Sequence, residues 1–342
     1  MGSMLGVRAL GNRVVQVDEF QIPAPSAGDV RIKILGAGVC GSDLRPYRSK
    51  PEDLGERRKI ILGHEPAGLV DALGQGARGL AVGDRVVVYH AAGCGHCREC
   101  KAFRPQYCAS CRLFGLTDNG SDAEYMLAPA HHCHVLPDEV SFEDAALASC
   151  IAGTGWSALR QQEVTAADTV AVYGLGPLGL ATALLAKALG ARVVGTEPSG
   201  PRRELAKEIG VDVVIDPVEG GAVEAVRAAA GGAVSKAVEA SGNATSRTNA
   251  IELAAPHGSI VMVGIGAKNI EVDAEALIGR QLRLIGSWTL EPDEMEALLD
   301  FMGERDLSFD PIITHRFPLS EAQQAFDTAD SRGTGRVMFS FD

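Results

Sequence analysis

The feature that most constrains this chain is a glycine-rich turn placed between a strand and a helix. Residues 169–173 form a continuous apolar run typical of a buried strand, and an apolar helical stretch extends to Leu189. The turn between them has the pattern G-x-G-x-x-G, whose glycines allow a tight turn, close approach of a pyrophosphate, and close packing of helix on strand. We therefore predict dinucleotide binding by the turn and the start of its helix, that is, by Gly174, Gly176, Pro177, Leu178 and Gly179.

An acidic residue follows the next predicted strand. Residues 192–196 form that strand, and Glu197 comes eighteen residues after Gly179. A carboxylate in this position can accept hydrogen bonds from the adenosine ribose and repels a 2′-phosphate. The predicted cofactor is therefore NAD rather than NADP. Arg202 is also predicted to lie at the cofactor, and together with Arg203 it weakens this preference without reversing it.

Strand and helix patterns continue to alternate after this point. Further strands are predicted at 211–215, 235–239, 259–264 and 282–286, which gives a doubly wound parallel α/β sheet of six strands. Short strands and turns dominate up to about residue 145 and predict a small β-barrel or sandwich-like domain. The tail is expected to return to that domain. The predicted domains are thus 1–150 with 287–342, and a Rossmann domain over 151–286.

Four cysteines fall within fifteen residues. Three of them are spaced three apart, and a tetrahedral set of four thiolates leaves a zinc ion no open position, which is typical of a structural site. An iron–sulfur cluster or unrelated free thiols remain alternatives. Cys111 is an alternative fourth ligand, and the histidines around Cys133 are interpreted as part of a strand. The predicted structural zinc lobe spans about residues 90–112, with the ligands Cys94, Cys97, Cys100 and Cys108.

A second group of chemically active residues lies on two glycine-rich turns. Cys40 and His64 are ligand types that suit zinc, although either one alone is more often a buried packing residue. Asp43 and Glu65 lie close enough in sequence to orient them. The pair therefore predicts a second metal site.

Composition excludes several classes of partner. The formal charge of −12 argues against nucleic acid and anionic membranes as partners. The sequence has no run approaching the roughly 20 apolar residues of a membrane helix, and its start lacks the pattern of a secretion signal. We expect a cytoplasmic protein that acts on a small molecule. In a reducing compartment its eight cysteines point to metal rather than to disulfides.

Over nearly its full length the chain resembles the zinc-dependent alcohol dehydrogenases of the medium-chain dehydrogenase/reductase superfamily. These proteins combine a GroES-like catalytic domain with a Rossmann coenzyme domain. The resemblance rests on the turns 38–43 and 63–68, the four-cysteine lobe, Cys150 with Thr154-Gly155, the glycine-rich turn, and Gly335-Arg336-Val337.

The resemblance implies two zinc ions per chain, one structural and one catalytic. It implies that Cys40, His64 and Cys150 hold the catalytic ion, which activates an alcohol that passes hydride to NAD⁺. The remaining implied roles are a proton acceptor (Ser42), a carboxylate behind the metal (Glu65), a partner that orients His64 (Asp43), a packing surface for the nicotinamide (Thr154) and a pyrophosphate ligand (Arg336). The best-known members carry a relay histidine where this chain has Arg45, which cannot deprotonate.

The substrate is less constrained. His90 matches a position that lines the substrate pocket, and with the polar loop 45–59 it favours a polyol, sugar, cyclitol or amino alcohol, whereas Cys150 favours a simple primary or secondary alcohol. Zinc-free reductases on the same scaffold and a non-catalytic, zinc-stabilised NAD-binding protein are further alternatives. The predicted edge strand 282–286 favours a homodimer or homotetramer.

Overall fold

The structure, a computed structural model, describes residues 2–341 and divides into two compact units. Unit 1 comprises Met1–Cys150, Glu291–Ser331 and Arg336–Asp342, and unit 2 comprises Ile151–Leu290 and Arg332–Gly335. The first boundary falls after Cys150, the chain returns to unit 1 at Glu291 rather than at residue 287, and four residues of the tail group with unit 2.

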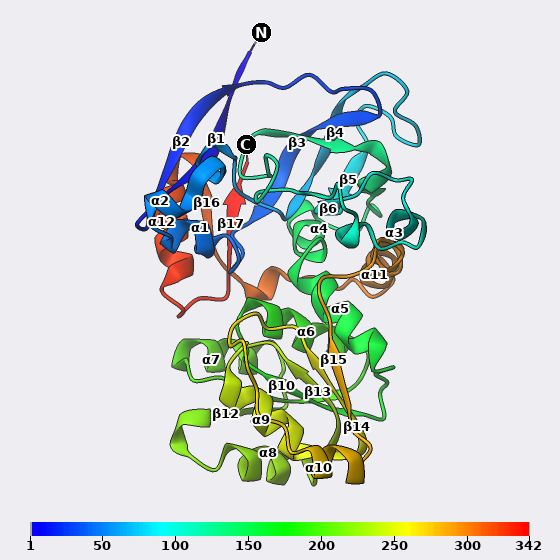
Figure 1. The fold of residues 1–342 in the computed structure, drawn as a ribbon, viewed down its shortest axis with the longest axis vertical. Helices are drawn as coiled ribbons and strands as arrows, with labels where there is room; N and C mark the ends of the chain where they lie inside the picture. Colours follow the sequence, from blue (N-terminus) through cyan, green and yellow to red (C-terminus); the bar gives the residue numbers. More distant parts are fainter. Residues whose placement is uncertain (1, 342) are drawn as a thin grey trace. The chain divides into compact units, whose positions relative to one another are not determined.

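Unit 2 is built on a six-stranded parallel sheet, as the alternating pattern predicts (Figure 1). Its order is β12 (Val213–Ile215), β11 (Arg192–Thr196), β10 (Thr169–Tyr173), β13 (Val234–Glu239), β14 (Ala254–Met262) and β15 (Arg283–Gly286). The strand order reverses beside β10, and open α/β sheets bind their ligands at such a switch point. The glycine-rich turn follows β10 directly, so the fold places the predicted dinucleotide site at this switch point.

Helices connect these strands. They are α5 (Ile151–Gln161), α6 (Pro177–Ala188), α7 (Gly200–Glu208), η4 (Pro217–Glu219), α8 (Ala222–Ala230), α9 (Ala244–Leu253) and α10 (Ala274–Gly279). The middle residues of β10 are buried, which explains its uninterrupted apolar run.

Unit 1 is the predicted GroES-like domain and has a mostly antiparallel sheet. The order is β16 (Ile313–Pro318), β17 (Arg336–Ser340), β3 (Asp29–Gly38), β4 (Pro66–Leu73), β5 (Arg85–Val88) and β9 (Cys133–Val135), while β8 (Tyr125–Pro129) pairs with β3. A hairpin, β1 (Ser3–Gly11) and β2 (Val14–Gln21), forms a separate sheet. Val30, Ile32 and Ile34 alternate along β3 and are fully buried in the core of the unit.

The C-terminal tail joins unit 1 from Arg336 onward. β17 pairs with β3 through Met338 and Phe339, and α12 (Ala322–Asp330) contacts β2, β16 and β17. The remaining helical elements of unit 1 outside the lobe are α1 (Leu44–Arg48), α2 (Pro51–Leu54), η1 (Gly55–Lys59), η3 (Ala130–His132), α4 (Phe142–Ala148), α11 (Pro292–Glu304), η5 (Asp310–Ile312) and η6 (Leu319–Glu321). The expected polar loop 45–59 is therefore three short helices, with Tyr47 and Leu54 buried.

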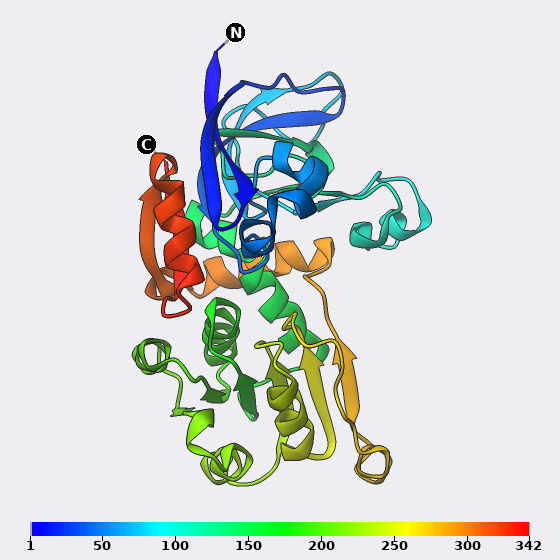
Figure 2. The same cartoon turned by 60° about the vertical axis from the view of Figure 1, so that its left-hand side comes forward.

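The cysteine-rich lobe is an excursion closed at its neck by two short strands. β6 (Ala91–Ala92) pairs with β7 (Arg112–Leu113), and the lobe between them contains α3 (Arg98–Lys101) and η2 (Pro105–Tyr107). Figure 2 shows this lobe standing out from the rest of unit 1. In residues 2–341, no helix has both the length and the apolar character needed to span a bilayer.

Candidate functional site

Three predicted metal ligands and one carboxylate meet inside unit 1. Cys40 follows β3, His64 and Glu65 precede β4, and Cys150 lies in the short break after α4. One donor atom of each residue lies within 4.8 Å of the others. The Sγ atoms of Cys40 and Cys150 are 3.9 Å apart. Tetrahedral zinc with Zn–S bonds of about 2.3 Å requires a sulfur–sulfur separation of about 3.8 Å. The donor set and its spacing therefore fit a zinc ion.

Asp43 fixes two of these ligands at once. Its Oδ1 lies 2.9 Å from His64 Nδ1, and its Oδ2 accepts a hydrogen bond of 2.8 Å from the backbone N–H of Cys40. The predicted orienting contact is thus present, and it leaves His64 Nε2 as the coordinating atom. Ser42 Oγ lies 3.2 Å from that Nε2, so its hydroxyl is at the metal site.

The two thiols titrate differently. The hydrogen bond from Cys150 lowers the pKa of Cys40 well below its usual value, and the same contact raises the pKa of Cys150. Burial opposes protonation of His64, but the Asp43 carboxylate and the Cys40 thiolate together raise its pKa well above the usual value. Cys40 is therefore the thiol that more readily becomes a thiolate ligand. Metal binding at this site also requires that Cys150 and His64 lose their protons.

Glu65 is held by Arg336 at the inner side of the ligand group. Arg336 Nη2 donates to Glu65 Oε2, and the two side chains are 1% and 0% exposed. Gly38 makes this contact possible, because a Cβ there would lie 2.7 Å from Arg336 Nη2 and closer still to Glu65 Oε2. The family resemblance implies a pyrophosphate ligand at Arg336. The structure places its side chain inside unit 1, and the cofactor role stays a prediction.

His90 lies next to the metal ligands. Its Nδ1 donates a hydrogen bond of 2.8 Å to the carbonyl of Ser149, and its ring centroid is 5.5 Å from that of His64 in an edge-on arrangement. Burial lowers the pKa of His90 to about 4. The ring is therefore neutral near pH 7, and with Nδ1 as the donor its Nε2 is a hydrogen-bond acceptor.

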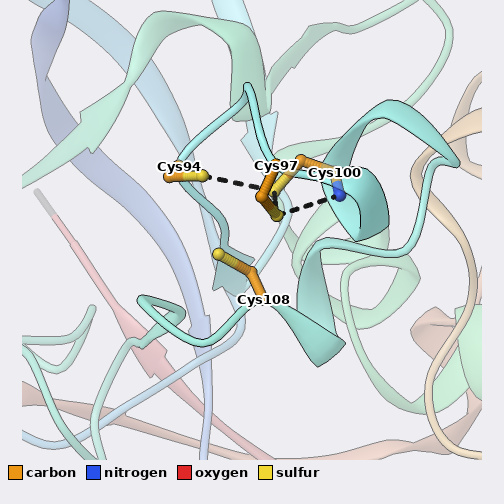
Figure 3. A group of neighbouring side chains, drawn as sticks. All are labelled: Cys94, Cys97, Cys100 and Cys108. Atoms are coloured by element: carbon orange, nitrogen blue, oxygen red, sulfur yellow. Dashed lines mark hydrogen bonds between the residues drawn. The ribbon is translucent and has the colours of Figure 1, made fainter.

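The lobe brings together the four cysteines predicted to form the structural site. Figure 3 shows the side chains of Cys94, Cys97, Cys100 and Cys108 turned toward one another, with donor atoms within 4.8 Å. The sulfur of Cys100 lies 3.5 Å from that of Cys97 and 4.0 Å from that of Cys94, close to the spacing zinc requires. Cys111 is outside this group. The structure therefore groups Cys108, rather than Cys111, with the other three sulfurs, and Cys108 stays the predicted fourth ligand.

The glycine-rich turn in unit 2 has the geometry its pattern predicts. Gly174 has φ +88°, and a Cβ on Gly179 would lie 2.9 Å from the carbonyl carbon of Gly174. Helix α6 begins at Pro177 with Gly176 as its N-cap. The turn therefore opens directly onto a helix N-terminus, where a phosphate group binds favourably.

Three more of the predicted cofactor residues, Glu197, Arg202 and Thr154, lie in the same unit. The Glu197 carboxylate follows β11 and accepts hydrogen bonds of 3.0 Å from the N–H groups of Leu175 and Ser199. Arg202 donates to the carbonyl of Thr334, and its Nη1 would lie 3.5 Å from a Cβ on Gly176. Both charged groups are therefore placed at the turn. Thr154 is buried in α5.

Sequence reasoning missed one acidic residue in unit 1. Asp122 precedes β8, is fully buried, and packs against Gly63, the residue before His64. The sequence around it reads as a turn leading into a strand, and no local pattern marks such an aspartate as buried. Only the long-range packing of residues 63 and 122 reveals it.

Comparison with known proteins places these sites in context. Residues 26–138 match the alcohol dehydrogenase GroES-like domain, and residues 177–304 match the zinc-binding dehydrogenase domain. An uncharacterised zinc-type alcohol dehydrogenase-like protein of Escherichia coli K12 is 35% identical over 100% of this chain and 99% of its own length. D-arabitol-phosphate dehydrogenase of Enterococcus avium is 31% identical over 94% of this chain and 92% of its own, and L-threonine 3-dehydrogenase of Saccharopolyspora erythraea is 32% identical over 95% of both.

Solved structures of dehydrogenases share the fold of this chain over its full length. An alcohol dehydrogenase of E. coli CFT073 in complex with NADH has a TM-score of 0.90 and 27% identity, covering 100% of both chains. A putative zinc-binding dehydrogenase of Sinorhizobium meliloti 1021 bound to NADP has a TM-score of 0.90 and 26% identity, also covering 100% of both.

Proposed function

Because this chain belongs to the zinc-binding alcohol dehydrogenase family, we propose that it oxidises a hydroxyl group of a small hydroxylated molecule, with NAD⁺ as the hydride acceptor. The reaction converts a primary or secondary alcohol and NAD⁺ into the aldehyde or ketone, NADH and a proton. The observation that carries this proposal is the convergence of Cys40, His64 and Cys150 in unit 1. Zinc-free reductases of this scaffold lack such a set.

Different residues serve metal binding and proton transfer. Bound zinc would supply a Lewis acid that lowers the pKa of the substrate hydroxyl, and bound NAD⁺ would accept the hydride. Asp43 holds His64 in the coordinating orientation, and Ser42 Oγ is positioned to accept the hydroxyl proton. Arg45 is exposed, and an arginine side chain has no hydrogen-bond acceptor, so the proton leaves through water rather than through a side chain at that position.

His90 supports a substrate with a second polar group. Its neutral Nε2 can accept a hydrogen bond from a hydroxyl or ammonium group beside the reacting carbon, a contact that a simple alkyl alcohol cannot make. Three relatives are named for hydroxylated substrates. Two are the D-arabitol-phosphate and L-threonine 3-dehydrogenases, and the third is a sorbitol dehydrogenase of Arabidopsis thaliana that is 28% identical to this chain. We therefore favour a polyol, sugar, cyclitol or amino alcohol over a simple alcohol.

Glu197 supports NAD as the cofactor. Its carboxylate is buried at the end of β11, where a 2′-phosphate would meet its negative charge. Arg202 acts in the opposite direction and favours NADP, because its guanidinium lies at the turn. A kcat/KM at least tenfold higher with NAD⁺ than with NADP⁺ is expected. Equal kcat/KM values with the two cofactors would contradict the role of Glu197 in selecting NAD⁺.

A substrate panel with NAD⁺, followed by NADH absorbance, tests the proposal. Turnover is expected on polyols, sugars or amino alcohols, with weaker turnover on simple alcohols. His90→Leu should raise KM for the hydroxylated substrates by about tenfold, the cost of one lost hydrogen bond, and leave simple alcohols little changed. Unchanged preference in that variant would exclude His90 from specificity. NAD⁺ binding without NADH formation on any member of the panel would favour a non-catalytic protein.

A further inference from the structure

Asp122 is a buried carboxylate that no part of the proposed reaction uses. Its side chain is 0% exposed, and neither Oδ1 nor Oδ2 has a hydrogen-bond partner within residues 2–341. Buried polar groups almost always have partners, and a buried ionised carboxylate without one is strongly unfavourable. This position therefore calls for a physical explanation.

The carboxylate packs against Gly63, the residue that precedes the metal ligand His64. Gly63 has φ +91°, and a Cβ there would lie 2.6 Å from the carboxylate carbon of Asp122 and closer still to Oδ1. The backbone N–H of Asp122 donates to the carbonyl of Leu62 at 2.9 Å. The N–H of Ser121 also donates to the carbonyl of Gly63 at 3.1 Å, so the backbone leading into Asp122 is tied to the turn that presents His64.

The charges around Asp122 leave it without a cation of its own. Burial raises its pKa well above the usual value, and the carboxylates of Asp43 and Glu65 raise it further. His64 and Arg336 act in the opposite direction, but the Arg336 guanidinium is bound to Glu65. A divalent ion held by Cys40, His64 and Cys150 would supply positive charge that opposes this rise in the pKa of Asp122.

We propose that Asp122 is a positioning residue of the metal centre, whose negative charge strengthens retention of the catalytic ion without touching it. The inference rests on the metal site of the proposed function and not on the substrate. A unit charge that lies roughly 10 Å from a divalent ion, at an effective dielectric constant of about 20, alters the affinity for the ion by about a hundredfold, and by about tenfold if the dielectric constant is doubled. Neutralising Asp122 should therefore weaken binding of this ion by at least tenfold.

Metal retention in a chelator titration tests this directly. Zinc-loaded wild type, Asp122→Asn and the smaller neutral variant Asp122→Ser are titrated with a competing chelator, and the ions bound per chain are counted by native mass spectrometry. The lobe ion is the internal control for folding. Asp144→Asn is the matched control, because Asp144 is a buried acid of unit 1 that is held by Ser308 and Phe309 rather than placed at the metal.

Both Asp122 variants should lose the catalytic ion at a free chelator concentration at least tenfold lower than the concentration that removes it from wild type. Their lobe ion, and both ions of Asp144→Asn, should be lost at the same chelator concentrations as in wild type. The inference would be overturned if the two Asp122 variants retain the catalytic ion as well as wild type does, or if the catalytic ion and the lobe ion are lost at equally lowered chelator concentrations. The proposed function would still stand in either case, provided that the wild type turns over alcohols. A wild type that holds only the lobe ion would overturn both.

Discussion

Replacing Arg336 separates the two roles available to that residue. The family resemblance predicts a pyrophosphate contact, whereas the structure binds the guanidinium to Glu65 inside unit 1. Methionine has a similar length and no charge, so Arg336→Met leaves Glu65 buried without its cation. If the buried pair is the main role of Arg336, the variant should lose stability rather than cofactor affinity.

The magnitude follows from burial. The two side chains are 1% and 0% exposed, so solvent cannot replace the lost partner. Breaking a buried ion pair by removing one partner costs about 3–5 kcal/mol. Glu65→Gln should cost a similar amount. The double variant should lose about 2–3 kcal/mol less unfolding free energy than the two single losses added together, because neither charge is then left without its partner. Burial lowers the pKa of Arg336, but the Glu65 carboxylate outweighs it and raises the pKa, so the guanidinium stays charged.

Urea unfolding of the four proteins provides the assay. Far-UV circular dichroism follows the whole chain, and tryptophan emission follows unit 2, which contains both Trp156 and Trp288. The stability loss should shift the circular dichroism transition more than the tryptophan transition of unit 2, and NAD⁺ affinity is measured in parallel. A stability loss below about 1 kcal/mol, combined with NAD⁺ binding weakened tenfold or more, would refute the buried-pair reasoning and restore the pyrophosphate role.

Three further predictions concern other parts of unit 1. Gly38→Ala should cost about 1–3 kcal/mol of unfolding free energy, because the added methyl group meets Arg336 Nη2 at 2.7 Å, whereas Gly279→Ala, in open space, should cost little. Cys108→Ser should lower the metal content by one ion per chain and Cys111→Ser by none; the reverse pattern would reassign the fourth ligand. Burial lowers the pKa of His132 to about 4, below its unfolded value of about 6.5, so its contribution is fully present above pH 6.5 and falls toward pH 4. Unfolding free energy should therefore drop by about 2 kcal/mol more between pH 7 and pH 5 in wild type than in His132→Asn, and equal drops would contradict this.

The parts of the fold and site that follow from local pattern could be predicted from the sequence. The glycine-rich turn after β10 and the cysteine spacing of the lobe are local signals with few alternative meanings, and both appear as expected. The convergence of Cys40, His64 and Cys150 was predicted through the family resemblance, since these residues span 110 positions and no local pattern links them.

Long-range packing accounts for what the sequence did not reveal. Tyr47 lies in a polar stretch expected to be a loop, yet its hydroxyl donates a 2.5 Å hydrogen bond to Asp327, which anchors α1 to α12. Asp122 is buried where Gly63 packs against it, 59 positions earlier in the chain. Contacts between residues 59 or more positions apart depend on the whole unit, so sequence spacing carries no sign of them.

Zinc content tests the central claim most directly. Elemental analysis of purified protein should find close to two zinc ions per chain in wild type and close to one in Cys40→Ser, with NADH formation lost in the variant and NAD⁺ binding retained. Zinc near zero in wild type, or two ions and full activity in Cys40→Ser, would contradict a catalytic centre built on Cys40, His64 and Cys150.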